Sequence, residues 1–230
     1  MLTLTPLEIE ALRLSLLVSG WAVAGSLPLG IGCAWVLARL DFPGKTLVDG
    51  ILHLPLVLPP VVVGYALLLL LGRRGPLGAV LHDWFGIVVA FTWKGAAIAS
   101  AVVAFPLMVR AIRLSLETVD RRLEQAARTL GAGPVDTFFT VTLPLVAPGV
   151  LTGVILAFAR SLSEFGATIT FVSNIPGETR TLPIALYALT QTPGGDAAAF
   201  RLCVIAVVVA FVALLASEIL ARRVQRLLQG

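Results

Sequence analysis

The chain has 230 residues, of which 58% are hydrophobic and 13% are charged, with a formal net charge of +4. Its mean hydropathy of +0.97 is far above what the core of a water-soluble domain needs. The apolar residues form continuous blocks, which indicates an all-α, polytopic helical membrane protein. The length fits one transmembrane domain over residues 1–230. No GxxxxGK[ST] phosphate loop is present, and basic loops explain the net charge without a nucleic-acid partner.

The first two apolar segments both contain proline. The first runs from about Leu14 to Leu37, and the second is uncharged from Gly50 to Gly72. Each is long enough to cross a hydrocarbon core of about 30 Å. The second segment carries Pro55, Pro59 and Pro60, so we expect its entrance to be broken or kinked.

A basic stretch separates the third and fourth apolar segments. The third covers roughly Ile87 to Val109, with Lys94 near its start and expected to reach the outer interface. The polar stretch from Arg110 to about Thr137 then forms the most basic loop of the chain. The fourth segment runs from about Val141 to Ser173.

A fifth segment, about 200–220, completes the predicted spans, and splitting the first or fourth would give six. The excess of arginine in the 110–128 stretch and in the C-terminal tail places both in the cytoplasm. We therefore expect a multi-pass protein of the cytoplasmic membrane, a lipid-embedded chain with its N-terminus outside and its C-terminus in the cytoplasm.

The basic loop contains a short predicted helix, from Glu124 to Leu130, that ends at Gly131. Its Ala126–Ala127 pair offers a small face that could approach a partner closely. Glu124 and Arg128 are spaced i, i+4 and could support each other. These residues alone leave two interpretations open, a docking element for a partner protein or an ordinary amphipathic loop.

The spacing of this loop resembles that of the permeases of ABC importers. Their cytoplasmic motif reads Glu-Ala-Ala, three residues, Gly, nine residues, Ile-x-Leu-Pro. Here Gln125 stands for the motif's Glu and Val141 for its Ile, at the full spacing. The resemblance implies a type I permease fold, with the loop at about 110–140 acting as a coupling helix in a cleft of an ATPase subunit. The residues it implicates are Glu124, Gln125, Ala126, Ala127, Arg128, Leu130, Gly131, Leu143 and Pro144.

Four further stretches are similar to the oxyanion branch of these permeases. They are 53–64, 105–113, 163–180 and 191–195. The pattern is most similar to molybdate permease subunits, with sulfate/thiosulfate and tungstate permeases as alternatives. The resemblance implies a transport subunit without catalytic residues, two cytoplasmic ATPase subunits that bind ATP-Mg, and an external oxyanion-binding protein. No cofactor is expected on this chain itself.

One chain of five spans can hardly enclose a channel, and the sequence has no internal repeat, so we predict a homodimer with the pathway on its two-fold axis. The fourth segment offers hydroxyls that could replace the water lost by an anion, or could bond to their own helix instead. They belong to Ser161, Ser163, Thr168, Thr170 and Ser173.

Two charged residues lie within the fourth segment. Arg160 and Glu164 are spaced i, i+4 and are predicted to form a structural ion pair near the outer half of the membrane. An ion-coupled secondary transporter is the rival class, but it would need several such intramembrane groups, and Glu164 is the single candidate. No metal site is expected.

Overall fold

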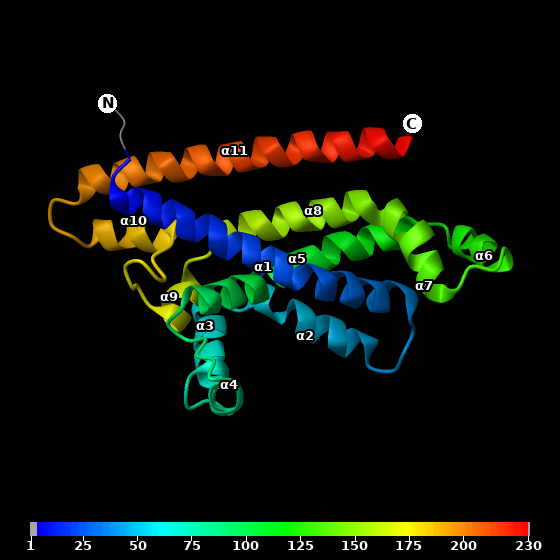
Figure 1. Ribbon diagram of the computed structural model, residues 1–230, viewed down its shortest axis with the longest axis horizontal. Coiled ribbons are helices and arrows are strands. Elements are labelled where there is room, and N and C mark those ends of the chain that lie inside the picture. Colours follow the sequence, from blue (N-terminus) through cyan, green and yellow to red (C-terminus); the bar gives the residue numbers. More distant parts are fainter. Residues whose placement is uncertain (1–3, 230) are drawn as a thin grey trace.

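A computed structural model describes residues 4–229, and every regular element in this part of the chain is a helix. Most of the helices run along one long axis, with α6 and α7 at one end and α10 at the other (Figure 1). The elements in chain order are α1 (Pro6–Arg39), α2 (Lys45–Val57), α3 (Pro60–Leu71), α4 (Pro76–Phe85), α5 (Trp93–Thr118), α6 (Arg121–Thr129), α7 (Pro134–Thr137), the π-helix η1 (Phe138–Thr142), α8 (Leu143–Leu162), α9 (Gly166–Val172), α10 (Leu182–Thr190) and α11 (Asp196–Gln229).

Four helical stretches of the described chain are long and apolar enough to cross a membrane. They cover residues 6–39, 93–118, 134–162 and 196–216. The bent pair α2–α3 makes a fifth if it is counted as one span. The predicted all-α architecture of about five spans is therefore confirmed. The arginines of the C-terminal tail, which were used above for orientation, include Arg222 and Arg226. The side chains of these two residues lie outside the described part of the chain.

The first helix is longer than predicted and is fixed at its N-terminal end. Thr5 and Glu8 form a capping box, in which each side chain bonds to the backbone of the other residue. The buried Glu8 carboxylate also accepts two hydrogen bonds from Arg201 of α11, at 2.8 and 2.6 Å. The first and last spans are thus joined by a bidentate ion pair. Pro28 lies inside α1 without ending it.

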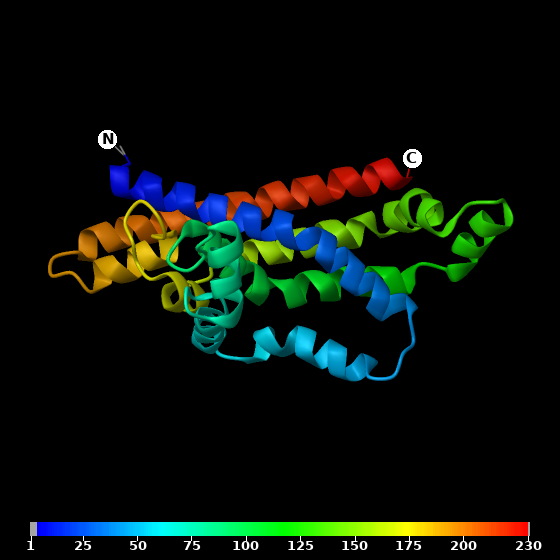
Figure 2. The ribbon, with the colours of Figure 1, turned by 60° about the horizontal axis from the view of Figure 1, so that its bottom comes forward.

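The second segment breaks in its middle rather than at its entrance. Helices α2 and α3 meet at an angle of 112°. The bend lies at the consecutive prolines Pro59 and Pro60, which cannot continue the helix. Pro55, by contrast, is accommodated inside α2. In Figure 2 α2 lies on the opposite side of the bundle from α11, and none of its residues is fully buried.

The third span begins later and ends later than predicted. Residues 87–92 are not helical; Phe91 has a φ of 62°, and Thr92 caps the helix by accepting a hydrogen bond from the amide of Gly95. Helix α5 then continues to Thr118, so the first part of the expected polar loop is helical.

The fourth segment is not continuous. Helices α7, η1 and α8 form one stretch that ends at Leu162, and α9 starts afresh at Gly166. With seven residues, α9 is far too short to span a membrane. The predicted segment from Val141 to Ser173 is therefore split at residues 163–165, as the alternative of a divided fourth segment allowed, although α9 does not add a span.

Helix α5 lies at the centre of the bundle. Its most extensive contacts are with α8 and α1, and 61% of its most apolar stretch is buried, against 11% for α11. Three groups of buried side chains fill the interior: one around Phe171 and Val103, one around Met108 and Ile112, and a smaller one around Leu182 and Leu202.

Helices α3 and α9 touch backbone to backbone. A Cβ added to Gly64 would lie 2.5 Å from the carbonyl oxygen of Ala167, and one added to Gly166 would lie 2.9 Å from Pro60. The two broken segments are thus packed on each other at positions where only glycine fits.

We expect Gly64→Ala to destabilise the protein, because the new methyl group overlaps backbone that cannot move cheaply. Overpacking of this kind costs about 1–3 kcal/mol, which would lower the melting temperature in detergent by several degrees. Gly20→Ala is the matched control, since no atom lies within 4 Å of its added Cβ, and it should leave the melting temperature unchanged or raise it. Equal effects of the two substitutions would contradict the close packing of α3 on α9.

Candidate functional site: the 121–142 loop and the 160–173 turn

The helix predicted around Glu124 is present as α6, and its ends follow the expected rules. Asp120 caps it by accepting a hydrogen bond from the amide of Arg122 at 2.9 Å. Glu124 lies in the first turn and Arg128 in the last, where each complements the helix dipole. Gly131 then turns the chain with a φ of 95°, a conformation that favours glycine.

The Glu124 side chain faces the protein instead of solvent. Its Oε1 accepts hydrogen bonds from Arg39 Nη2 at 2.8 Å and from Thr142 Oγ1 at 2.9 Å. The side chains of Arg39 and Glu124 are 8% and 14% exposed. The ion pair of Glu124 is therefore with the end of α1, and the support expected from Arg128 is not what the structure contains.

The outer face of the loop combines polar and apolar side chains. Gln125, Ala126 and Arg128 are exposed. Beside them Leu130, Val135 and Phe139 are 89%, 70% and 60% exposed. Apolar residues that are this open and close in sequence suit contact with another protein better than contact with water. We call these three residues the apolar patch of the loop.

The sequence interpretation missed three residues of this region. Val135 and Phe139 were visible only as apolar positions in a polar stretch. Arg39 had no signal, because 85 residues separate it from Glu124.

The loop returns to the bundle through the π-helix η1. Leu143 is half-buried and begins α8, and Pro144 follows as the second residue of that helix. The connection between α1 and α2 carries an exposed ion pair of Lys45 and Asp41 at 2.9 Å. The Lys45 ammonium keeps the pKa of Asp41 below its usual range.

The break between α8 and α9 is stabilised by Glu164. The structure contains the ion pair expected from the sequence, with Arg160 Nη1 at 2.7 Å from Glu164 Oε2. The other carboxylate oxygen accepts a hydrogen bond from the amide of Ala167 at 2.8 Å. Glu164, which is 2% exposed, therefore satisfies one of the free amides at the start of α9.

The five hydroxyl residues of this segment do not gather in one place. Ser161 and Thr168 are buried, whereas Ser163 and Ser173 are exposed. Three of the hydroxyls donate to carbonyl oxygens three or four residues earlier in the chain, those of Ser163, Thr168 and Thr170. The buried Oγ of Ser161 makes no hydrogen bond within the described residues.

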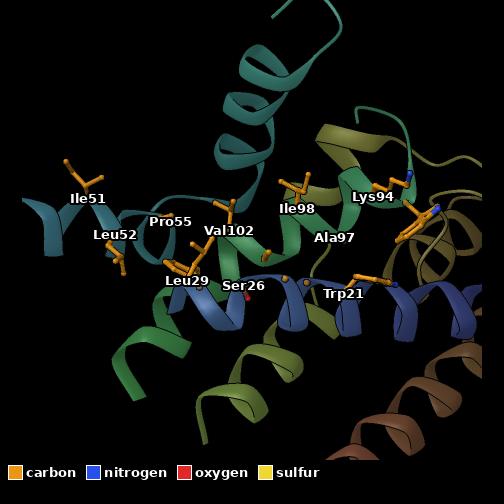
Figure 3. A pocket seen from close by; sticks show the side chains of 15 residues that line it. Trp21, Ser26, Leu29, Ile51, Leu52, Pro55, Lys94, Ala97, Ile98 and Val102 are labelled. Atoms are coloured by element: carbon orange, nitrogen blue, oxygen red, sulfur yellow. The ribbon is translucent and has the colours of Figure 1, made fainter. Parts of the chain in front are cut away.

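A groove with a volume of about 860 Å³ lies between α1, α2 and α5 (Figure 3). Its walls are apolar side chains such as Leu29, Leu52 and Val102. Lys94 lies at one end, and its Nζ is 6.0 Å from the ring centre of Trp93. None of the five hydroxyl residues lines this groove.

Apolar helices long enough to cross a membrane, two broken membrane segments and a peripheral loop with exposed apolar side chains fit the membrane subunit of a transport system. The chain belongs to the family of binding-protein-dependent transport system inner membrane components, whose model matches residues 26–226. It is a transport component and not an enzyme.

Relatives of known function are similar over nearly the whole chain. The molybdenum transport system permease protein ModB of Escherichia coli (strain K12) is 65% identical over 219 residues, which cover 95% of this chain and 96% of the relative. The protein of that name in Haemophilus influenzae is 58% identical over 96% of each chain. The sulfate transport system permease protein CysW of Synechococcus elongatus is 41% identical over 76% of this chain and 61% of its own length.

Solved structures share the fold at low sequence identity. A bacterial ABC transporter involved in the import of alginate matches 96% of this chain and 80% of its own, with a TM-score of 0.76 and 18% identity. An amino acid ABC transporter matches 96% and 94%, with a TM-score of 0.63 and 20% identity.

The turn at Gly131 gives a testable consequence. Gly131→Ala forces a residue with a Cβ into a left-handed conformation, which costs about 1–2 kcal/mol, and should shift or fray the end of α6. We expect the variant to retain less ATPase subunit on co-purification than the wild type. Gly133→Ala, at a φ of −69°, should bind normally, and equal loss in both variants would contradict a role for the Gly131 turn.

Proposed function

We propose that this chain is the membrane-spanning permease of an ATP-driven importer for molybdate. The observation that carries the substrate is the 65% identity to the Escherichia coli molybdenum permease over 95% of the chain. The alternative is a sulfate/thiosulfate or tungstate permease. It is supported less well, because the sulfate permease relative is 41% identical over 76% of this chain.

The 121–142 loop is the proposed docking element for a cytoplasmic ATPase. The apolar patch of Leu130, Val135 and Phe139 would be covered by the ATPase, beside the small Ala126–Ala127 face. Gln125 is exposed and Glu124 is turned inward, so Gln125 is the residue of the pair that would contact the ATPase. ATP and Mg²⁺ would be bound by that partner.

The assembly we propose contains two copies of this chain, two ATPase subunits and an external oxyanion-binding protein. The groove between α1, α2 and α5 is open on one side, which supports a pathway completed by a second copy. Helices α1 and α11 both run toward the end of the bundle that carries α6 (Figure 1). If α6 is cytoplasmic, the N-terminus lies outside and the C-terminus in the cytoplasm.

The pathway for the anion has a polar and an apolar part. An oxyanion needs hydrogen-bond donors to replace its water, but a deep cationic site would hold it too tightly to release it. Ser161, whose buried hydroxyl keeps its hydrogen-bonding capacity free, is our first candidate of the five for such a donor. Arg160 is occupied by Glu164 at 2.7 Å, so its charge is neutralised.

Reconstitution tests the proposal directly. The chain, its cognate ATPase and its binding protein are placed in proteoliposomes, and uptake is measured with molybdate, tungstate and sulfate in turn. We expect ATP-dependent uptake of molybdate. ATP hydrolysis stimulated strongly by sulfate, with no response to molybdate, would overturn the substrate assignment.

The docking role of the apolar patch has its own test. Leu130→Asp places a charge where we expect a protein contact, so the ATPase should be lost on co-purification at a concentration that saturates the wild type. Truncating or charging a central contact residue costs about 2 kcal/mol or more, roughly a 30-fold weaker complex. Leu4→Asp, at an exposed leucine just before α1, should bind the ATPase normally.

A further inference from the structure

Three elements of the chain meet at one oxygen atom. Glu124 Oε1, on α6, is 2.8 Å from Arg39 at the end of α1 and 2.9 Å from Thr142 at the end of η1. Arg121 of α6 adds a hydrogen bond from its guanidinium to the carbonyl oxygen of Ala38, at 3.3 Å. The docking helix is thus tied to two membrane spans, α1 directly and α8 through η1.

The ion pair at this point is well shielded from water. Arg39 and Glu124 are 8% and 14% exposed, and removing one partner of a shielded pair leaves a charge without compensation. Arg39 uses Nη2 for the bond, while its Nε is buried without a hydrogen bond to any described residue. The guanidinium therefore retains a second donor for a fork-like contact when α6 changes position.

The walls of the apolar groove are attached to different parts of the chain. Its α1 wall ends at Arg39, which is bound to α6. Its α2 wall is bound to α5, because Asp49 Oδ2 lies 3.1 Å from Arg113 Nη1. A displacement of α6 would consequently act on α1, the wall that is joined to it through Arg39.

We infer that Arg39, Glu124 and Thr142 form a clamp that makes α1 move with the docking helix. The inference rests on the proposed function, since the force on α6 comes from an ATPase. In this arrangement ATP-driven movement reaches α8 through Thr142 and α1 through Arg39, and both helices pack on α5. Arg39 is a positioning residue, which contacts neither the ATPase nor the anion, and the clamp sets the width of the groove.

The test measures coupling instead of activity alone. Arg39→Gln and Glu124→Gln are each reconstituted with the ATPase and the binding protein, and the molybdate transported per ATP hydrolysed is recorded. We expect this ratio to fall between about 2-fold and 30-fold, the range of single substitutions along a coupling element. The exchanged pair, Arg39→Glu with Glu124→Arg, should recover a large part of the loss.

Two further variants keep the result interpretable. Lys45→Gln breaks an exposed ion pair in the adjoining α1–α2 connection and should leave the ratio unchanged, because exposed pairs contribute little. Thr142→Val removes only the hydroxyl, at nearly constant volume, and should lower the ratio by about 2-fold.

The movement itself can be followed with spin labels at Leu40 and Thr129, both exposed, after replacement of Cys33 and Cys203. In the assembled wild-type complex their separation should stay the same with and without a non-hydrolysable ATP analogue. In Arg39→Gln the separation should change when the analogue binds. A separation that changes already in the wild type would show that α1 does not follow α6.

An unchanged ratio in Arg39→Gln and Glu124→Gln would overturn the clamp. So would a loss of transport that merely tracks the loss of bound ATPase, since that result assigns the pair to docking. Failure of the proposed function is distinguishable, because the wild type itself would then show no molybdate uptake.

Discussion

A polypeptide inside a lipid bilayer must satisfy its own backbone hydrogen bonds, and this requirement shapes every irregular part of the chain. The two breaks in its membrane segments are not left open. At the first break, between α2 and α3, Pro59 and Pro60 have no amide hydrogen that would need a partner. At the second, the carboxylate of Glu164 accepts from the amide of Ala167 while the guanidinium of Arg160 neutralises its charge. The broken ends then pack on each other through Gly64 and Gly166.

Sequence reasoning worked where the signal is local. Long apolar stretches predict the spans, glycine predicts the end of α6, and the i, i+4 spacing predicts the contact of Arg160 with Glu164. It was less reliable where two local rules compete. Pro55 and Pro59 carry the same propensity, yet the first is inside α2 and the second ends the helical path. Pro60 decides between them, because it directly follows Pro59 and restricts the backbone of that residue.

Contacts across the fold were the least predictable part. Glu124 had an arginine four residues away and pairs instead with one 85 residues earlier, because burial against α1 and η1 strengthens the distant contact. The hydroxyl residues show the converse. Ser163, Thr168 and Thr170 bond to their own helices, so their spacing in the sequence reflected local backbone chemistry more than a shared lining. The exposure of Leu130, Val135 and Phe139 became visible only when the loop was seen outside the bundle.

The ion pair of Glu8 with Arg201 has a consequence for how the protein is made. The two residues are 193 positions apart, so the carboxylate is synthesised long before its partner and must wait for it in an aqueous or headgroup environment. The N-terminal end of the first helix can reach its final, shielded position only after the last helix has been added. Assembly of the bundle therefore finishes when the start of α1 pairs with the start of α11. In a chain truncated before Arg201, the carboxylate of Glu8 would lack this partner.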